Sequence, residues 1–172
     1  MKTIIPILTL VSSLTLAHAQ SYVSSLDPAQ DGGGARTGIG NVSYTLTGNS
    51  MAVSGNFSGL SGNSIAAHIH GPSAPFPSTG SVRYDFGALG LITLGGTSGT
   101  VSGSFNLGDI GAYTVAQQKA DLDAGLWYLN IHSTTFGGGE IRGVLQLVPE
   151  PSSLCLFGLG AGGLFYRLRR KQ

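Results

Sequence analysis

Three histidines and one glutamate are the residues of this sequence whose types and spacing could support metal chemistry. His68 and His70 stand two positions apart, so in a β-strand their side chains would point to the same face. Imidazole ligands suit zinc and copper. His132 would add a third imidazole, and Glu140 a carboxylate, if the strands that carry them are neighbours. The pattern therefore predicts a candidate copper or zinc site.

The same residues also have a purely structural interpretation. On its expected strand, His132 shares the polar face with Tyr128 and Asn130, opposite an apolar face. Glu140 and Arg142 share the polar face of the following strand and could simply pair with each other on a solvated sheet. Exposed pairs of this kind typically contribute less than about 1 kcal/mol. At this point the residues allow both a metal site and a hydrogen-bonded, solvated sheet face.

The elements that must position these residues are short, alternating strands. A hairpin is expected over residues 36–60, turning at Gly48 and Asn49. Further strands are expected over residues 65–70, with Ile65 on the apolar face, and over 81–86, 99–107, 126–132 and 140–148. Seven or eight such strands and one short helix fit an all-β fold, either an antiparallel β-sandwich or a partly closed barrel.

One short helix is expected over residues 115–123. Thr114 and Gln117 form a capping-box pattern at its start, and Gly125 suits a left-handed stop at its end.

Composition supports a protein of strands and turns and excludes several classes. Charged residues make up 10% of the 172-residue chain, against about 25% in typical soluble domains, and glycine occupies 28 positions. Residues 20–148 contain four basic and seven acidic side chains, so nothing suggests nucleic-acid binding. The only cysteine, Cys155, lies outside that stretch, which therefore has no disulfide and no cysteine nucleophile.

The first nineteen residues are typical of a secretory signal peptide. Lys2 precedes an apolar stretch over residues 4–16, and a small-x-small pattern predicts cleavage by signal peptidase between Ala19 and Gln20. The chain is therefore expected to leave the cytoplasm.

The end of the chain combines Pro149, Glu150 and Pro151 with a short apolar stretch over residues 154–166 and a basic terminus. Residues 149–172 resemble the bacterial PEP-CTERM sorting signal. The resemblance implies transient contact with the inner membrane and cleavage by an exosortase-type enzyme. A permanent tail anchor is the alternative.

The stretch between these ends resembles the CHRD domain, named from chordin. The resemblance is carried by residues 26–30 (LDPAQ), 57–60 (FSGL), 67–72 (AHIHGP), 127–133 (WYLNIHS) and 138–143 (GGEIRG). It implies a superoxide-dismutase-like or immunoglobulin-like sandwich over residues 20–148. Ser133 stands where the family usually has threonine.

The strand with two histidines is also similar to the copper-ligand strand of Cu/Zn superoxide dismutase. That similarity implies His68, His70 and His132 as copper ligands. The predicted domain has no fourth histidine and no disulfide, so dismutase activity is the least supported variant.

The resemblances together predict an exported cell-surface or extracellular-matrix protein with a non-enzymatic role. A polysaccharide or another surface protein is the expected partner. The alternative is an extracytoplasmic copper- or zinc-binding domain.

Overall fold

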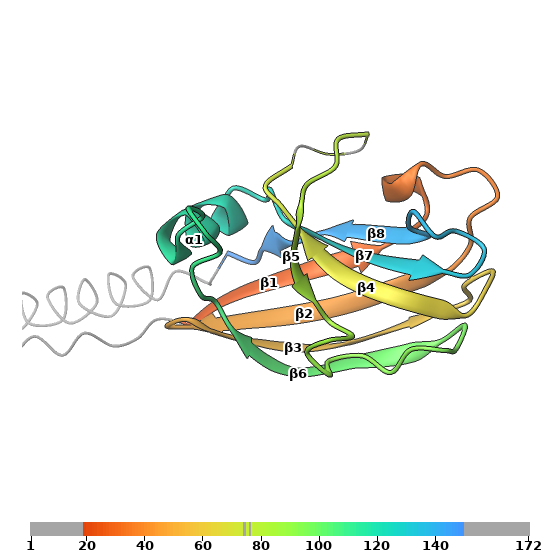
Figure 1. The fold of residues 1–172 in the computed structure, drawn as a ribbon, viewed down its shortest axis with the longest axis horizontal. Helices are drawn as coiled ribbons and strands as arrows, with labels where there is room; N and C mark the ends of the chain where they lie inside the picture. Colours follow the sequence, from red (N-terminus) through yellow and green to blue (C-terminus); the bar gives the residue numbers. More distant parts are fainter. Residues whose placement is uncertain (1–18, 74, 76, 150–172) are drawn as a thin grey trace, which may run out of the picture.

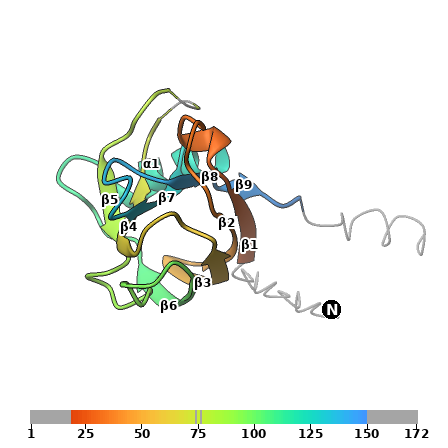
Figure 2. The ribbon, with the colours of Figure 1, turned by 90° about the vertical axis from the view of Figure 1, so that its right-hand side faces the viewer.

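A computed structural model describes residues 19–73, 75 and 77–149 as a sandwich of two antiparallel sheets (Figure 1). One sheet has five strands in the order β6-β3-β2-β1-β9, and the other has four in the order β5-β4-β7-β8. Seen from the side, the sheets form two layers (Figure 2). The predicted all-β sandwich is confirmed, with nine strands in the described residues rather than seven or eight.

The five-stranded sheet is built from strands that alternate buried and exposed side chains. The predicted hairpin is present as β2 and β3, and Gly48 makes its turn at a φ of 59°. Inward-facing residues of these strands, such as Tyr44 and Met51, are at most 1% exposed. The strands are β1 (Ala19–Leu26), β2 (Ile39–Thr47), β3 (Ser50–Ser58), β6 (Gly99–Asn106) and β9 (Gln146–Leu147).

The four-stranded sheet carries all the histidines of the described chain. Its central strands, β4 and β7, pair antiparallel, with His68 opposite Asn130 and Ala66 opposite His132. The sheet consists of β4 (Ser64–His70), β5 (Val82–Asp85), β7 (Tyr128–Ser133) and β8 (Ile141–Val144). Two histidine-bearing segments that are far apart in the chain therefore lie side by side.

The hydrophobic core fills the space between the sheets. Trp127, Leu129 and Ile131 come from the β7 region and are completely buried, as is Ile141 of β8. Their polar neighbours in the sequence consequently face the other side of the sheet, as the alternation predicts.

The helix α1 (Val115–Asp123) has the predicted bounds. Its capping box is formed by Thr114 and Gln117, and Gly125 adopts a φ of 68° just after it. A short 3₁₀ turn, η1 (Ala29–Asp31), follows β1. Within the described part of the chain, no helix is long and apolar enough to cross a membrane.

Two details of the predicted strands are wrong. Ile65 does not belong to the apolar face: it is 48% exposed, because a register shift between Ser64 and Ala66 turns Ser64 inward instead. The single strand expected over residues 140–148 is divided at the buried Leu145, so β8 pairs with β7 whereas β9 pairs with β1 of the other sheet. The chain thus crosses between layers where one continuous strand was expected.

The predicted signal peptide and sorting segment lie almost entirely outside the described residues. Of the predicted site residues there, Ala19 and Gln20 begin β1, and Pro149 follows β9. Cleavage between Ala19 and Gln20 stays a prediction.

Candidate metal centre

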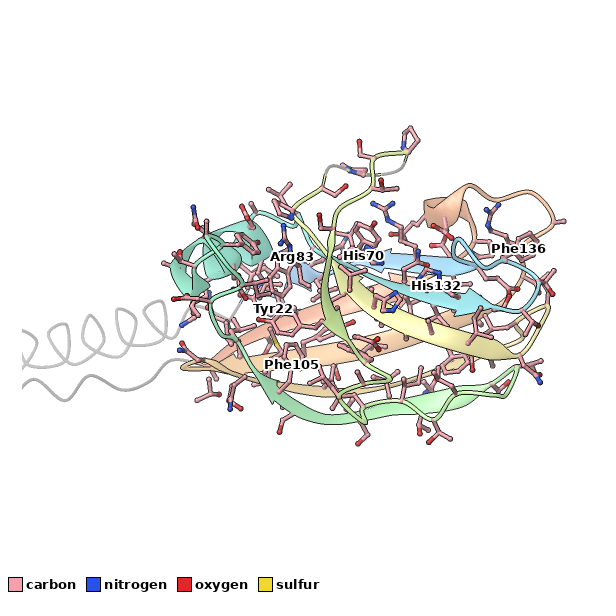
Figure 3. All side chains as sticks on the ribbon, viewed as in Figure 1. Tyr22, His70, Arg83, Phe105, His132 and Phe136 are labelled. Carbon is pink, nitrogen blue, oxygen red and sulfur yellow. The ribbon has the colours of Figure 1, made fainter. Side chains whose placement is uncertain are left out.

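Three imidazoles converge on the face of the four-stranded sheet that points away from the core. His68 and His70 come from β4 and His132 from β7, and one ring nitrogen of each lies within 4.8 Å of the others. Figure 3 labels His70 and His132 above these strands. The convergence follows from two local facts: the i, i+2 spacing on β4, and the pairing of β4 with β7.

Backbone carbonyl groups fix which nitrogen carries the proton in two of the rings. His70 Nδ1 lies 2.9 Å from the Gly80 oxygen, and His132 Nδ1 lies 3.0 Å from the Gly137 oxygen. Because a carbonyl oxygen can only accept, both Nδ1 atoms donate, and each Nε2 keeps its lone pair. A second group that holds the far nitrogen of a histidine in this way is usual at metal sites.

His68 is the third ring, and its two nitrogens face different partners. His68 Nδ1 donates to His132 Nε2 at 3.1 Å, and His68 Nε2 lies 3.7 Å from Asp85 Oδ2. A tautomer of His68 with its proton on Nε2, beside the Asp85 carboxylate, would leave a third lone pair on Nδ1. The candidate ligand atoms are thus His68 Nδ1, His70 Nε2 and His132 Nε2.

The electrostatic surroundings favour neutral imidazoles. Burial lowers the pKa of both His70 and His132, and this effect outweighs the hydrogen bonds to Gly80 and Gly137, which raise it. Both rings are therefore neutral at pH 7, the form that binds a metal ion. His70 Nε2 is buried and has no hydrogen-bond partner in the described structure. A buried polar atom without a protein partner is uncommon and normally binds an ion or an ordered water.

An aromatic and cationic layer supports the site from the β8 side. The Tyr128 ring stacks on His70 with centroids 4.9 Å apart and planes 1° apart. The Tyr128 hydroxyl accepts from the Gly80 nitrogen at 3.2 Å. Tyr128 therefore also holds Gly80, whose oxygen accepts the hydrogen bond from His70. The Arg142 guanidinium lies 3.4 Å from the Tyr128 ring centre and donates to the Ser78 oxygen at 2.9 Å. These contacts hold the segment before β5 against the histidines.

Glu140, the predicted carboxylate candidate, belongs to a different network. Its Oε1 accepts at 2.6 Å from both the nitrogen and the hydroxyl of Ser61, and more weakly from Thr37. Burial by itself raises the pKa of Glu140, but hydrogen bonds from Ser133, Ser61 and Thr37 together hold the pKa below its ordinary value. The structure does not group Glu140 with the histidines.

The interpretation of this face as a solvated sheet surface is wrong for Glu140 and Arg142. Glu140 is 0% and Arg142 1% exposed, because loops fold over the polar side of the sheet. Arg142 stacks on Tyr128, while Glu140 accepts from Ser61. Neither residue therefore acts as half of an exposed surface pair.

Asp85 is the residue near the site that sequence reasoning missed. Arg83 and Asp85 stand two positions apart in the sequence, a spacing that on its own favours a simple surface pair on one strand face. In the structure Arg83 donates to the Gly71 oxygen and lies over the Tyr113 ring, whereas Asp85 pairs across the sheet with His68. The proximity of Asp85 to His68 follows only from the pairing of β4 with β5, and no local sequence pattern predicts that pairing.

The site has the dimensions of a three-histidine metal centre. Bonds of about 2.0–2.1 Å from a metal to three imidazoles separate the nitrogens by roughly 3.3–3.6 Å. The observed separations, from 3.1 Å for one pair to at most 4.8 Å, reach this range through small side-chain rotations. The arrangement offers three neutral nitrogen ligands.

The fold and the site together define an all-β sandwich whose polar sheet face gathers three histidines. Comparison with known families is consistent with that description: the CHRD domain matches residues 13–145, and the chain belongs to the CHRD domain family. No curated protein and no solved structure matches the chain.

The end of the chain matches a second family. The PEP-CTERM protein-sorting motif covers residues 147–171, which confirms the predicted resemblance. The motif implies export, sorting to the cell surface and processing by exosortase. The predicted domain boundaries at residues 20 and 148 differ slightly from the matched range and stay predictions.

Proposed function

We propose that this chain is a non-enzymatic cell-surface protein whose CHRD domain binds one copper or zinc ion through His68, His70 and His132. The observation that carries the proposal is the approach of three imidazole nitrogens to within 4.8 Å of one another. Imidazole is a ligand for both metals, so the donor set alone allows either ion.

Two features support a metal site over an ordinary hydrogen-bonded cluster. A structural histidine normally uses both ring nitrogens, whereas the buried His70 Nε2 has no partner in the described structure. The Nδ1 atoms of His70 and His132 are also both committed to carbonyl oxygens, which aims both lone pairs at the same space. Fixing the tautomer in advance lowers the cost of organising the site when an ion binds.

The limited access to the ligand atoms supports binding rather than catalysis. His132 is 8% exposed, and the half-buried His70 is stacked on one face by Tyr128 and bonded through Nδ1 to the Gly80 oxygen. A second reactant would have to reach an ion held behind these groups. A polysaccharide or surface-protein partner for the outer surface of the domain stays a prediction.

The direct test is a titration of the full-length chain, purified in mild detergent, with copper and with zinc. We expect one equivalent of ion per chain, and a loss of affinity of at least about 100-fold in His70→Ala, because removal of a ligand should cost no less than loss of its supporting groups. Ser104→Ala, on the far sheet, is the matched control and should bind like the wild type. Binding weaker than millimolar, or equal binding by His70→Ala, would contradict the metal site.

A superoxide assay on the copper-loaded chain tests the non-enzymatic part of the proposal. Activity at the background level of free buffer is expected. Activity that exceeds background and disappears in His70→Ala would reassign the domain as a copper enzyme.

A further inference from the structure

We propose that the three-histidine site selects monovalent copper, Cu(I), over divalent zinc and copper, and that Arg142 sets this preference. The inference rests on the proposed function and names the ion and its oxidation state. It comes from the charges around the site rather than from the ligands themselves.

Arg142 places a fixed positive charge behind one of the ligands. Its side chain is 1% exposed, and its guanidinium carbon lies 3.4 Å from the Tyr128 ring centre. The same ring stacks on His70. Because β7 lies between β4 and β8, Tyr128 stands between the guanidinium and the imidazole. Arg142 is therefore one aromatic ring away from a candidate ligand.

The positive charge of Arg142 acts on the candidate ligand His70. Only the Tyr128 ring separates the guanidinium from the His70 imidazole, and charges in such a buried region are screened less than in water. A fixed positive charge at this place repels a cation bound by His70, and a dication is repelled about twice as strongly as a monocation.

Nearby carboxylates offset this charge only in part. Asp85 lies 3.7 Å from His68 Nε2, but its side chain is 47% exposed and is screened by water. Asp31 interacts electrostatically with both Arg142 and Arg36, so it is shared between two cations. The three grouped ligand atoms are all imidazole nitrogens, and none is a carboxylate oxygen.

The number of ligands also favours Cu(I). Zinc held by three histidines needs a water as its fourth ligand, whereas the closed-shell Cu(I) ion can be bound by three ligands alone. Three histidines beside a buried cation therefore suit an ion of low charge and low coordination number.

The test compares Cu(I) and zinc affinities of the full-length chain in mild detergent. Cu(I) is measured without oxygen against a Cu(I)-specific chromogenic chelator, and zinc against a zinc chromogenic chelator. Arg142→Met removes the charge and Arg142→Lys keeps it. We expect Arg142→Met to shift the affinity ratio toward zinc by about threefold or more, and Arg142→Lys to keep the wild-type ratio.

Asp85→Asn provides a second variant that does not disturb the buried arginine. Removal of this exposed carboxylate should shift the ratio the other way, toward Cu(I). If the wild type binds both ions but neither variant changes the ratio, the selection by charge is overturned while the metal site stands. If the wild type binds neither ion, the proposed function itself fails.

Discussion

Replacing Glu140 by glutamine tests how the structure assigns this residue. Glu140 is fully buried, and its Oε1 accepts two 2.6 Å hydrogen bonds from Ser61 and two longer ones from Thr37. These bonds tie the segments before β2 and β4 to the start of β8. Glutamine keeps the shape but removes the charge that all four donors face.

The expected cost follows from the two short bonds. A hydrogen bond to a charged group contributes about 1.5–3 kcal/mol, and bonds that share one acceptor do not add fully. Glu140→Gln should therefore lower the free energy of unfolding by about 2–4 kcal/mol, measured by chemical unfolding with Trp127 fluorescence. Thr37→Val removes the 3.4 Å side-chain bond to Glu140 together with the exposed bonds of the same hydroxyl to Gly59 and Ser61, and it should cost less, about 1 kcal/mol. If Glu140→Gln lowers the free energy of unfolding by less than about 0.5 kcal/mol, the smallest contribution of an ordinary hydrogen bond, the reasoning is refuted.

The same variant separates the structural role of Glu140 from a role as metal ligand. Glu140 lies outside the histidine group, so folded Glu140→Gln protein should bind copper within about threefold of the wild type. Complete loss of binding in a folded variant would mean that Glu140 is a ligand after all.

Two further predictions concern stability. Gly139→Ala should lower the free energy of unfolding by more than about 2 kcal/mol, because a Cβ there would lie 2.3 Å from Asp31 Oδ2 at a φ of 129°. Gly48→Ala has a positive φ but open space around it, so it should cost only about 1 kcal/mol. Equal costs for the two variants in chemical unfolding would contradict the close packing at Gly139. Burial lowers the pKa of His70 and His132, so below pH 6.5 the unfolded chain binds more protons than the folded one. The free energy of unfolding of the metal-free protein should therefore fall from pH 7 to pH 5, and a flat profile in this range would contradict the neutral state of these rings.

Local patterns in the sequence were sufficient to predict most of the elements and most strand faces, but not strand β1, the division between β8 and β9, or the exposed position of Ile65. Alternation placed His68 and His70 on one face, and the capping residues Thr114 and Gln117 defined the start of α1. These features depend on neighbours within four residues, so a single sequence contains the information needed to predict them.

Features set by distant contacts could not be predicted in this way. The pairing of β4 with β7 joins segments that are far apart in the chain, and it alone brings His132 to His68. The register shift that exposes Ile65 depends on Ser64 accepting backbone bonds from Gly95, in another loop.

The burial of the polar face was the largest departure from expectation. A strand with alternating polar residues usually has its polar side in water. Here loops from three parts of the chain cover that side, and Glu140 and Arg142 each find partners there. The alternation showed which side was polar but not that it would be enclosed.

X-ray absorption on the copper-loaded, full-length chain tests the central claim most directly. The account predicts three imidazole nitrogens at about 2.0 Å from one ion per chain, and fewer in His132→Ala. A copper environment with at most one imidazole, or one unchanged in His132→Ala, would contradict the convergence of His68, His70 and His132 on a single ion.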